Sequence, residues 1–563
     1  MIGRDGRKII NFRPVLLFSS SLALGIGGAY AAEVHELPLA AFILVLLAAG
    51  VLLCALSGEI KNTPFILTAF LLAFGMGALS FRAQLNAYRK GRSIGGETSV
   101  VGTVEKIGLG DSYAVLTLGD LTFNGEERAG KLRLQLSSVA AQSLNLSDEL
   151  FFDCEIFSMQ TLAGEFRADL VSDDVRYVAY KASGLAVVGA EFNLFRSIAN
   201  RLRGALQRGM DETTAAVTYA LLTGESSGID EGLLENVRRG GIAHIFAVSG
   251  LHIGALYAFL RLLIVKTGLK RGSKTTRFLF VAFILLFYSG VCGFSPSVLR
   301  AAIMCLATYL AELFGTKSDP LERLGFAALI VLLLDPASLF AIGFQLSFAA
   351  AAGILVFSRT LGDVMLAPVL ALSARGDRGG ENLSREEIAE KRLLFRFLQP
   401  AIGLLAVTLS AQIATAPFQL NAFGYLSGWG LLLNVLIVPL VGAVYSAVFL
   451  LAFLATVFPS GAAVLLFLPN AFISAVLLPF QSLSFSFSLF EGVRFSLPSA
   501  ILYYALVSLL SKKTNLPRTV KATAFFVLLF ALECTMYQTN GRITAFIQGK
   551  ILQSQSLAFF WTL

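Results

Sequence analysis

The chain has 563 residues, of which 56% are hydrophobic and only 15% are charged, and its mean hydropathy is +0.72. This composition excludes an ordinary soluble protein, since soluble domains carry about 25% charged residues. It indicates a polytopic membrane protein, and the formal net charge of +8 does not require a nucleic-acid partner. The cysteines show no CxxC spacing, so we predict neither disulfides nor a cysteine metal site; they are Cys54, Cys154, Cys292, Cys305 and Cys534.

Residues 1–81 are predicted to form a membrane unit of three spans. The apolar runs at 14–32, 37–57 and 64–81 approach the length of about 20 residues that crosses a bilayer. The basic segment before the first run places the N-terminus in the cytoplasm. Ala29-Tyr30-Ala31 resembles a signal-peptidase site, but the length of the run and the spans that follow favour an uncleaved anchor.

Residues 82–190 are predicted to form an OB-like β-barrel outside the membrane. Turn residues separate short segments of alternating polarity, which lie at 98–108, 113–123, 130–138, 149–159 and 175–184. About five strands at this spacing are typical of a small antiparallel barrel. Acidic residues slightly outnumber basic ones in this stretch, which argues against a strong grip on DNA here.

Residues 191–240 are predicted to form amphipathic helices at the membrane surface. Apolar residues recur at helical spacing between Phe192 and Met210, which is typical of a helix that lies in the interface. The arginines fall largely on other faces, and an alternative interpretation is a row that follows DNA; they are Arg196, Arg201, Arg203 and Arg208.

Residues 241–536 contain ten further candidate spans, at 242–265, 278–294, 296–314, 324–334, 339–357, 398–417, 429–457, 461–480, 498–510 and 522–536. The loop at 266–277 has five cations and no acid, and loops of this kind are cytoplasmic. The charge-rich stretch 359–397 and the stretch 512–521, which carries only cations, are placed on the same side. Thirteen crossings satisfy these charges. Because 324–334 is short and Pro439 interrupts another run, the count falls to about eleven if some helices are broken.

The stretch GIAHIFAVSGLHIG, from Gly241 to Gly254, holds two of the three histidines of the chain. Polar groups inside a membrane usually mark a functional site. On one helix, at about 100° per residue, His244, Ser249 and His252 share one broad face. Glycines there would let another backbone approach closely. The alternative is a packing seam between helices.

A set of motifs in one order resembles ComEC-type competence proteins, which are membrane channels thought to pass one strand of incoming DNA into the cytoplasm. The motifs are LLTGESSGI at 221–229, HIFAVSGLHIG at 244–254, GFSPSVLRAAIM at 293–304, DPLERLG at 319–325, DPASLFAIGFQLSFAA at 335–350 and Gln412 to Pro417. The resemblance extends to the N-terminal spans and their OB-like insert. It implies uptake of single-stranded DNA across the cytoplasmic membrane during natural transformation.

Polar residues in the spans are the candidates for lining a path. An arginine contact to phosphate is charge-assisted and forked, so Arg300 is the foremost candidate. The alternative is that Arg300 bonds helix carbonyls and staples the bundle. The full candidate set is His244, Ser249, Gly250, Leu251, His252, Gly254, Ser295, Pro296, Arg300, Gln345, Ser347, Gln412 and Asn434.

One departure from the family pattern concerns the C-terminal end. Many members end in a metallo-β-lactamase-like domain, thought to be a nuclease, and such a site needs His and Asp ligands. Residues 537–563 contain neither, so we expect a short tail without this domain, no metal or cofactor, and no enzyme activity. The chain is then either a short family form or a truncated product.

The resemblance also implies partners. No P-loop of the GxxxxGK[ST] kind is present, so a motor has to come from the cytosol. The expected partners are single-stranded DNA, membrane lipid, an external DNA receptor, a separate nuclease and a cytosolic motor, with a homodimer left open.

Two other functions compete with this interpretation. Ser249 and His252 are spaced to meet on a helix, which fits an intramembrane hydrolase, but no carboxylate lies near them in the segment. Broken helices with polar residues also fit a secondary transporter of a small solute. That reading leaves the barrel unexplained, and no inverted repeat is apparent.

Overall fold

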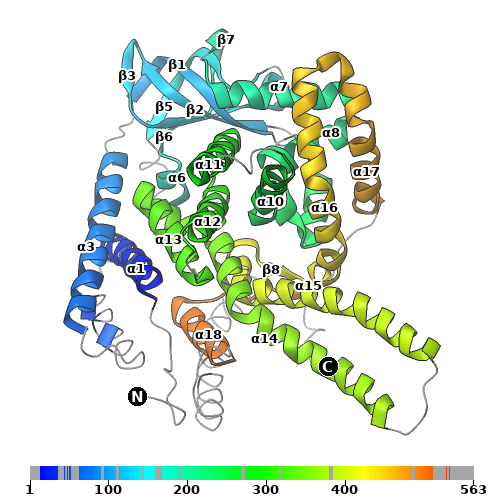
Figure 1. Ribbon diagram of the computed structural model, residues 1–563. Helices are drawn as coiled ribbons and strands as arrows, with labels where there is room; N and C mark the ends of the chain where they lie inside the picture. Colours follow the sequence, from blue (N-terminus) through cyan, green and yellow to red (C-terminus); the bar gives the residue numbers. More distant parts are fainter. Residues whose placement is uncertain are drawn as a thin grey trace, which may run out of the picture.

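The structure, a computed structural model, is a helical membrane bundle with one β-barrel at its end (Figure 1). It describes residues 13–35, 43–44, 47, 50–51, 63–89, 94–109, 113–141, 144–158, 168–190, 192–226, 228–246, 248–267, 273–315, 319–378, 385–482, 488–510, 528 and 532. The predicted spans at 37–57 and 522–536 lie largely outside these residues, and the loop at 512–521 and the tail at 537–563 lie wholly outside them.

Eight helices of the described chain are long and apolar enough to cross a membrane. They are α1 (Pro14–His35), α3 (Thr63–Tyr88), α11 (Lys274–Val291), α12 (Pro296–Leu313), α14 (Ile342–Arg378), α15 (Arg385–Phe423), α16 (Trp429–Val457) and α17 (Ala462–Ser482). Three shorter helices accompany them: α10 (Gly250–Lys266), α13 (Pro320–Leu334) and α18 (Leu497–Leu510). The polytopic helical fold is confirmed, and Pro439 lies inside a continuous α16.

Two glycines bring α1 and α3 into backbone contact. A Cβ on Gly25 would lie 2.0 Å from the carbonyl oxygen of Phe74, and one on Gly77 would lie 2.2 Å from that of Leu22. Small residues at such crossings are the usual means of close helix packing in membranes. An ion pair joins the start of α1 to the start of α13: Arg13 Nε lies 2.7 Å from Asp319 Oδ2.

Five strands close the barrel in the order β1 (Ile94–Leu109), β2 (Tyr113–Phe123), β4 (Lys131–Ser137), β6 (Val175–Ala179), β5 (Asp148–Ser158) and back to β1. Only the β4–β6 pair is parallel. This connectivity fits the five-stranded OB fold, which confirms the OB-like prediction.

Two details of the barrel differ from the sequence interpretation. A hairpin adds β3 (Glu126–Arg128) to β2 through Asn124 and Gly125, both at positive φ, as tight hairpin turns require. The predicted strand at 175–184 is two strands, β6 and β7 (Ser183–Ala190). The chain turns between them and Gly184 adopts a φ of +66°, a conformation that glycine favours.

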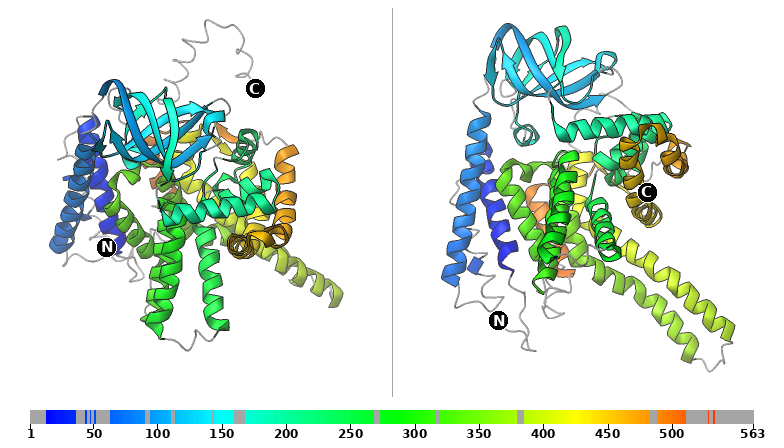
Figure 2. Two further views of the ribbon diagram at one scale, coloured as in Figure 1. Left: turned by 90° about the horizontal axis from the view of Figure 1, so that it is seen from above. Right: turned by 45° about the horizontal axis from the view of Figure 1, so that its top comes forward.

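Three helices follow the barrel: α7 (Leu194–Gly209), α8 (Glu212–Thr223) and α9 (Glu231–Arg239). Figure 2 (right) shows α7 lying across the ends of the spanning helices, beneath the barrel. Its amphipathic pattern is real, but its apolar residues pack on α8, α16 and α17. The face that we assigned to lipid therefore contacts protein, since these helices end at the level of α7.

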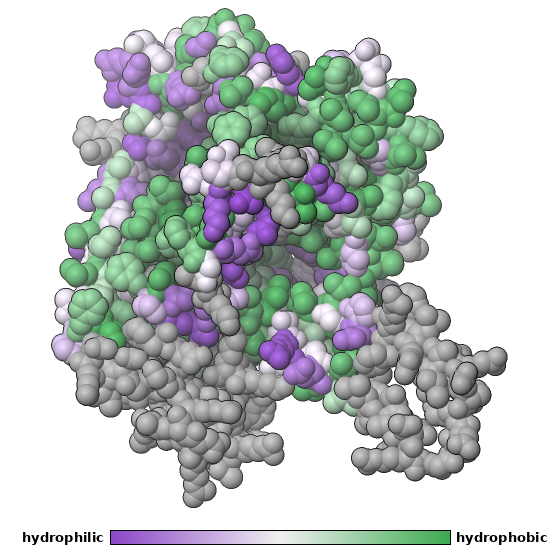
Figure 3. Space-filling view, viewed as in Figure 1, coloured by the Kyte–Doolittle hydropathy of each residue, from purple (hydrophilic) through white to green (hydrophobic). Residues whose placement is uncertain are grey.

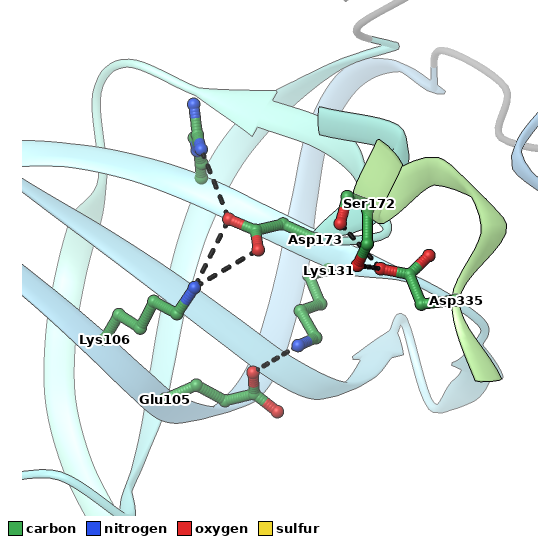
Figure 4. A network of polar contacts seen from close by, with 8 residues as sticks. Glu105, Lys106, Lys131, Ser172, Asp173 and Asp335 are labelled. Carbon is green, nitrogen blue, oxygen red and sulfur yellow. Dashed lines mark hydrogen bonds and ion pairs between the residues drawn. The ribbon is translucent and has the colours of Figure 1, made fainter. Parts of the chain in front are cut away.

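Polar contacts attach the barrel to the helices (Figure 4). Ser172, on α6 (Ala168–Ser172), donates to Asp335 Oδ2 at 2.7 Å, and Gln84 of α3 donates to Asp335 Oδ1 at 2.6 Å. On the barrel wall, Glu105 pairs with Lys131 at 2.7 Å and with Arg196 of α7 at 3.2 Å. The barrel is therefore fixed both at the end of α13 and along α7.

The basic start of α11 lies on the side of the helices away from the barrel. A Cβ on Gly290, near the end of α11, would meet the ring of Phe195 on α7, so Lys274 at the start of α11 points the other way. Figure 2 (right) shows the start of α1 and the far end of the α14–α15 hairpin on that same side. Figure 3 shows hydrophobic residues over α16 and α17, with hydrophilic ones near β3 and the ends of α10 and α11.

Replacing Asp335 with alanine is expected to lower the thermal unfolding temperature in detergent. The change removes the acceptor for Gln84, Ser172 and Ser338, and a buried donor without an acceptor costs about 1–3 kcal/mol. The control is Asp173→Ala, which removes two largely exposed ion pairs, with Lys106 and with Arg133, and should change little. Equal effects of the two substitutions would contradict the anchoring role.

Cys154 of β5 is expected to resist alkylation by maleimide at neutral pH while the barrel is folded. Burial raises the pKa of its thiol to about 12, and the charge of Asp153 acts in the same direction. The reactive thiolate is therefore scarce until the barrel unfolds. Mass spectrometry of the chain after labelling with and without denaturant measures this; rapid labelling of the folded barrel would show that the thiol is accessible.

Candidate functional site

Five helices contact one another in a closed circle, in the order α10, α12, α14, α15, α16 and back to α10. Each carries candidate residues from the sequence: His252 on α10, Arg300 on α12, Ser347 on α14, Gln412 on α15 and Asn434 on α16. We call these helices the five-helix ring. The other candidates lie on the same helices or directly before them, so residues from a stretch of nearly 200 positions converge on one assembly.

In the described residues 241–246 and 248–249 the chain forms no α-helix, contrary to the prediction of one span at 242–265. Gly241 has a φ of +72° and its Cα lies close to Gly430. A short 3₁₀ helix, η2 (Ala243–Ile245), follows, and α10 begins only at Gly250. The prediction that His244, Ser249 and His252 share a helical face is therefore wrong, because Ser249 caps the helix and His244 precedes it.

Ser249 and His252 form a capping box at the start of α10. The Ser249 hydroxyl accepts from the backbone N–H of Leu251 at 3.3 Å, and His252 Nδ1 accepts from the backbone N–H of Ser249 at 3.1 Å. A capping box satisfies donors that a helix start leaves unpaired. Since Nδ1 accepts, the imidazole proton sits on Nε2, an atom that is buried and has no partner among the described residues.

This geometry argues against a nucleophilic serine. The Ser249 hydroxyl lies 3.4 Å from His252 Nδ1, which is long for a base that removes its proton. The lone pair of Nδ1 already accepts the backbone N–H. Among the described residues no carboxylate is bonded to either side chain, so nothing orients the imidazole as in a triad.

His252 packs on a pair of buried tyrosines. Its ring centroid lies 4.5 Å from that of Tyr445 on α16. The Tyr445 hydroxyl lies 2.5 Å from that of Tyr288 on α11, which donates to the carbonyl of Leu222 at 2.6 Å. This series of contacts joins α10 and α16 of the ring to α8 and α11 outside it. The sequence did not single out these tyrosines, since each sits in an ordinary apolar run.

Arg300 is a buried cation without a counter-charge in the described chain. Its side chain lies between α12 and α14, where Nε donates to the Ser347 hydroxyl at 2.9 Å and Ser347 donates to Ser297 at 3.0 Å. The residue is only 9% exposed, and its guanidinium lies 5.8 Å from the ring centre of Phe348. The predicted alternative of bonds to helix carbonyls is not seen; the partner is a hydroxyl.

A second polar cluster lies where α15, α16 and the end of α9 meet. Gln412 Nε2 donates to the carbonyl of Ser427 at 3.4 Å, and the Ser427 hydroxyl donates to the carbonyl of Arg239 at 2.5 Å. A Cβ on Gly430 would fit tightly here, at 3.2 Å from Gln412 Nε2 and 3.3 Å from the backbone of Gly241. One turn further along α16, Asn434 is 8% exposed, and its Oδ1 has no partner in the described chain.

The remaining candidates have varied surroundings. His244 is exposed, and Leu251 packs near Gly442. Ser295 occupies the N-cap position of α12 without a capping hydrogen bond from its side chain, and Pro296 is in the first turn. Gln345 donates to the carbonyl of Leu339 on η4 (Pro336–Phe340), so its amide is used in the connection between α13 and α14. Gly254 has no atom within 4 Å of an added Cβ, so the predicted close approach of a backbone at this glycine is wrong.

One ion pair near the ring escaped the sequence interpretation. Glu225, in the LLTGESSGI motif, accepts from Arg203 of α7 at 3.0 Å and from the Tyr219 hydroxyl at 3.3 Å. The Arg203 guanidinium also lies 4.6 Å from the centre of the Tyr219 ring. The glutamate was visible as the only acid of its motif, but its partner comes from another helix. In the described chain no group of three or more His, Cys, Asp or Glu residues is placed to hold a metal ion.

Comparison with known proteins shows that these helices lie in a stretch that matches a protein family. A family model described as "Competence protein" matches residues 221–530, more than half of the chain. ComE operon protein 3 of Bacillus subtilis (strain 168) is 26% identical over 227 residues, which are 40% of this chain and 24% of that protein. An uncharacterized protein, the MG316 homolog of Mycoplasma pneumoniae, is 30% identical over 163 residues, 28% of this chain and 42% of that one.

The aligned segments thus cover less than half of either relative. No solved structure matches the chain. All five helices of the ring lie within the residues that the family model matches.

Replacing Ser249 with alanine is expected to destabilise the start of α10 without removing any chemistry. Loss of an N-cap hydroxyl costs about 1 kcal/mol, so a modest fall in unfolding temperature is expected, and Ser249→Asp should restore much of it. A fluorophosphonate probe for nucleophilic serines should leave Ser249 unmodified. Its labelling in the folded protein would support a hydrolase instead.

Proposed function

Because the chain belongs to the Competence protein family, we propose that it is a channel for uptake of single-stranded DNA across the cytoplasmic membrane during natural transformation. The observation that carries this proposal is the five-helix ring, whose candidate polar residues include the buried and uncompensated Arg300. Ionisable groups inside a membrane usually face a bundle interior or a wet path. In this proposal the chain performs transport and no bond-making chemistry.

In this proposal the barrel stands at the entrance for incoming DNA and does not bind the DNA tightly. It is attached at Asp335, next to the start of α14, and through Glu105 to α7. Phosphate contacts need cations, and several barrel cations are already neutralised by acids, as in the Lys131–Glu105 and Lys106–Asp173 pairs. We therefore assign the barrel to the outer side, above the ring, with the N-terminus in the cytoplasm.

Movement of a polyanion needs a driving force that the described chain does not supply from a nucleotide site. The sequence has no P-loop. We propose that a cytosolic motor pulls the strand, that an external receptor delivers the DNA, and that a separate nuclease removes the other strand.

A strain that lacks the gene is expected to lose transfer of labelled donor DNA into the cytoplasm, while binding at the cell surface persists. The measurement is the amount of label protected from external nuclease, with the gene restored on a plasmid as the control. Uptake at the parental rate in the deletion strain would refute the channel function. Loss of a small solute's uptake instead would favour a transporter.

Arg300 variants are expected to separate charge from packing. Arg300→Ala should reduce uptake per folded molecule more than Arg300→Lys, because lysine keeps the charge but loses the forked donors. Ser249→Ala should leave uptake per folded molecule measurably intact, since a wet pore tolerates the loss of one hydroxyl. Equal uptake per molecule by wild type and both Arg300 variants would leave this residue with a packing role only.

A further inference from the structure

The first turn of α10 presents one unused donor. The capping box uses the backbone N–H groups of Ser249 and Leu251, and those of His252 and Ile253 bond to the Ser249 carbonyl at 3.1 and 3.2 Å. The N–H of Gly250 has no acceptor among the described residues. The four N–H groups at a helix start need partners from outside the helix, so this one remains available to a ligand.

The Arg300 guanidinium lies against the same turn. A Cβ added to Gly250 would be 3.2 Å from Arg300 Nη2, so the side chain approaches this backbone from α12. Its Nε is held by Ser347, and in the described chain its two Nη groups have no hydrogen-bond partner. A side chain that is nine-tenths buried therefore places Nη donors without a hydrogen-bond partner in the described chain beside the backbone of Gly250.

These two groups have the same electrostatic sign. The N-terminus of a helix carries a partial positive charge, and a cation facing it is unfavourable unless an anion lies between them. The described residues supply no such anion, because no carboxylate pairs with Arg300. An incoming anion would satisfy both groups at once.

We propose that Gly250 and Arg300 form a binding station for one phosphate group, which rests on the proposed function for its identity as a phosphodiester of the transported strand. One phosphate oxygen accepts from the Gly250 N–H while the guanidinium donates through its Nη groups, a forked contact that suits phosphate. Glycine lets the backbone come close to the ligand, as at other helix termini that bind phosphate.

This assignment changes the roles of the residues Ser249, Gly250 and His252 at the start of α10. Ser249 and His252 hold the start of α10 in place and leave the Gly250 N–H without an acceptor among the described residues. Ser347 and Ser297 fix the orientation of the guanidinium from α14 and α12. Binding thus falls to Gly250 and Arg300, and the serines and the histidine position them.

The chain offers a matched pair of glycines for the test. Gly250 and Gly254 are one turn apart on α10, and a Cβ on Gly254 meets nothing within 4 Å. Alanine favours a helix at both positions, so both variants should fold. Of the two, only Gly250→Ala crowds the guanidinium, which must move by a few tenths of an ångström, and only this variant should affect the station.

The experiment measures binding of fluorescein-labelled dT12 to the full chain in nanodiscs of neutral phosphatidylcholine. Arg300→Ala should weaken binding at least about 10-fold and Gly250→Ala about 3- to 10-fold, whereas Gly254→Ala should match wild type. A dT12 with neutral methylphosphonate linkages should bind all four proteins alike. Gly250→Ala and Arg300→Ala that both bind dT12 as wild type does would overturn the station.

A second arm separates the sources of phosphate. If nanodiscs with phosphatidylglycerol weaken dT12 binding to wild type but not to Gly250→Ala, the site belongs to a lipid headgroup and the assignment to a nucleic acid is overturned. Unchanged binding in these discs supports a strand in the ring. If the variants lose dT12 binding while a deletion strain still takes up DNA, the station stands and the channel function fails.

Discussion

The end of a helix placed inside the membrane bundle is the constraint on which the ring depends. Gly241 has a positive φ and packs on Gly430, and the α-helix that follows begins only at Gly250. A helix that starts within the bundle exposes backbone donors there, and they must be satisfied. The capping box satisfies most of them, and the close approach of Arg300 follows from the absence of a side chain at Gly250.

Polar contacts join the N-terminal spans, the barrel and the helices of the ring where these three parts meet. Asp335 accepts from α3, from the barrel and from η4, so one carboxylate holds an N-terminal span, the barrel and the start of α14. Gln345 on α14 continues this connection by donating to the carbonyl of Leu339. Ser347, which bonds to Arg300, lies two residues after Gln345 on the same helix. The barrel is thus connected to the arginine through a short segment of α14.

The sequence predicted the fold well where a pattern repeats and the site poorly where it depends on contacts. Long apolar runs and alternating strands are local signals, so the bounds of α16 and β2 follow directly from them. The break before α10 was missed because its residues are as apolar as those of a span. The positions of Arg300 beside Gly250 and of Glu225 beside Arg203 come from packing between distant helices, which periodicity does not encode.

The lengths of α14 and α15 have a mechanical consequence. With 37 and 39 residues at 1.5 Å per residue, each is about 55 Å long, whereas the hydrocarbon layer is about 30 Å thick. The hairpin that they form extends on the side away from the barrel (Figure 2). A protein that approaches the membrane from that side would contact the ends of α14 and α15 before it reaches the lipid. A force applied at these ends would be transmitted along the two helices to the ring.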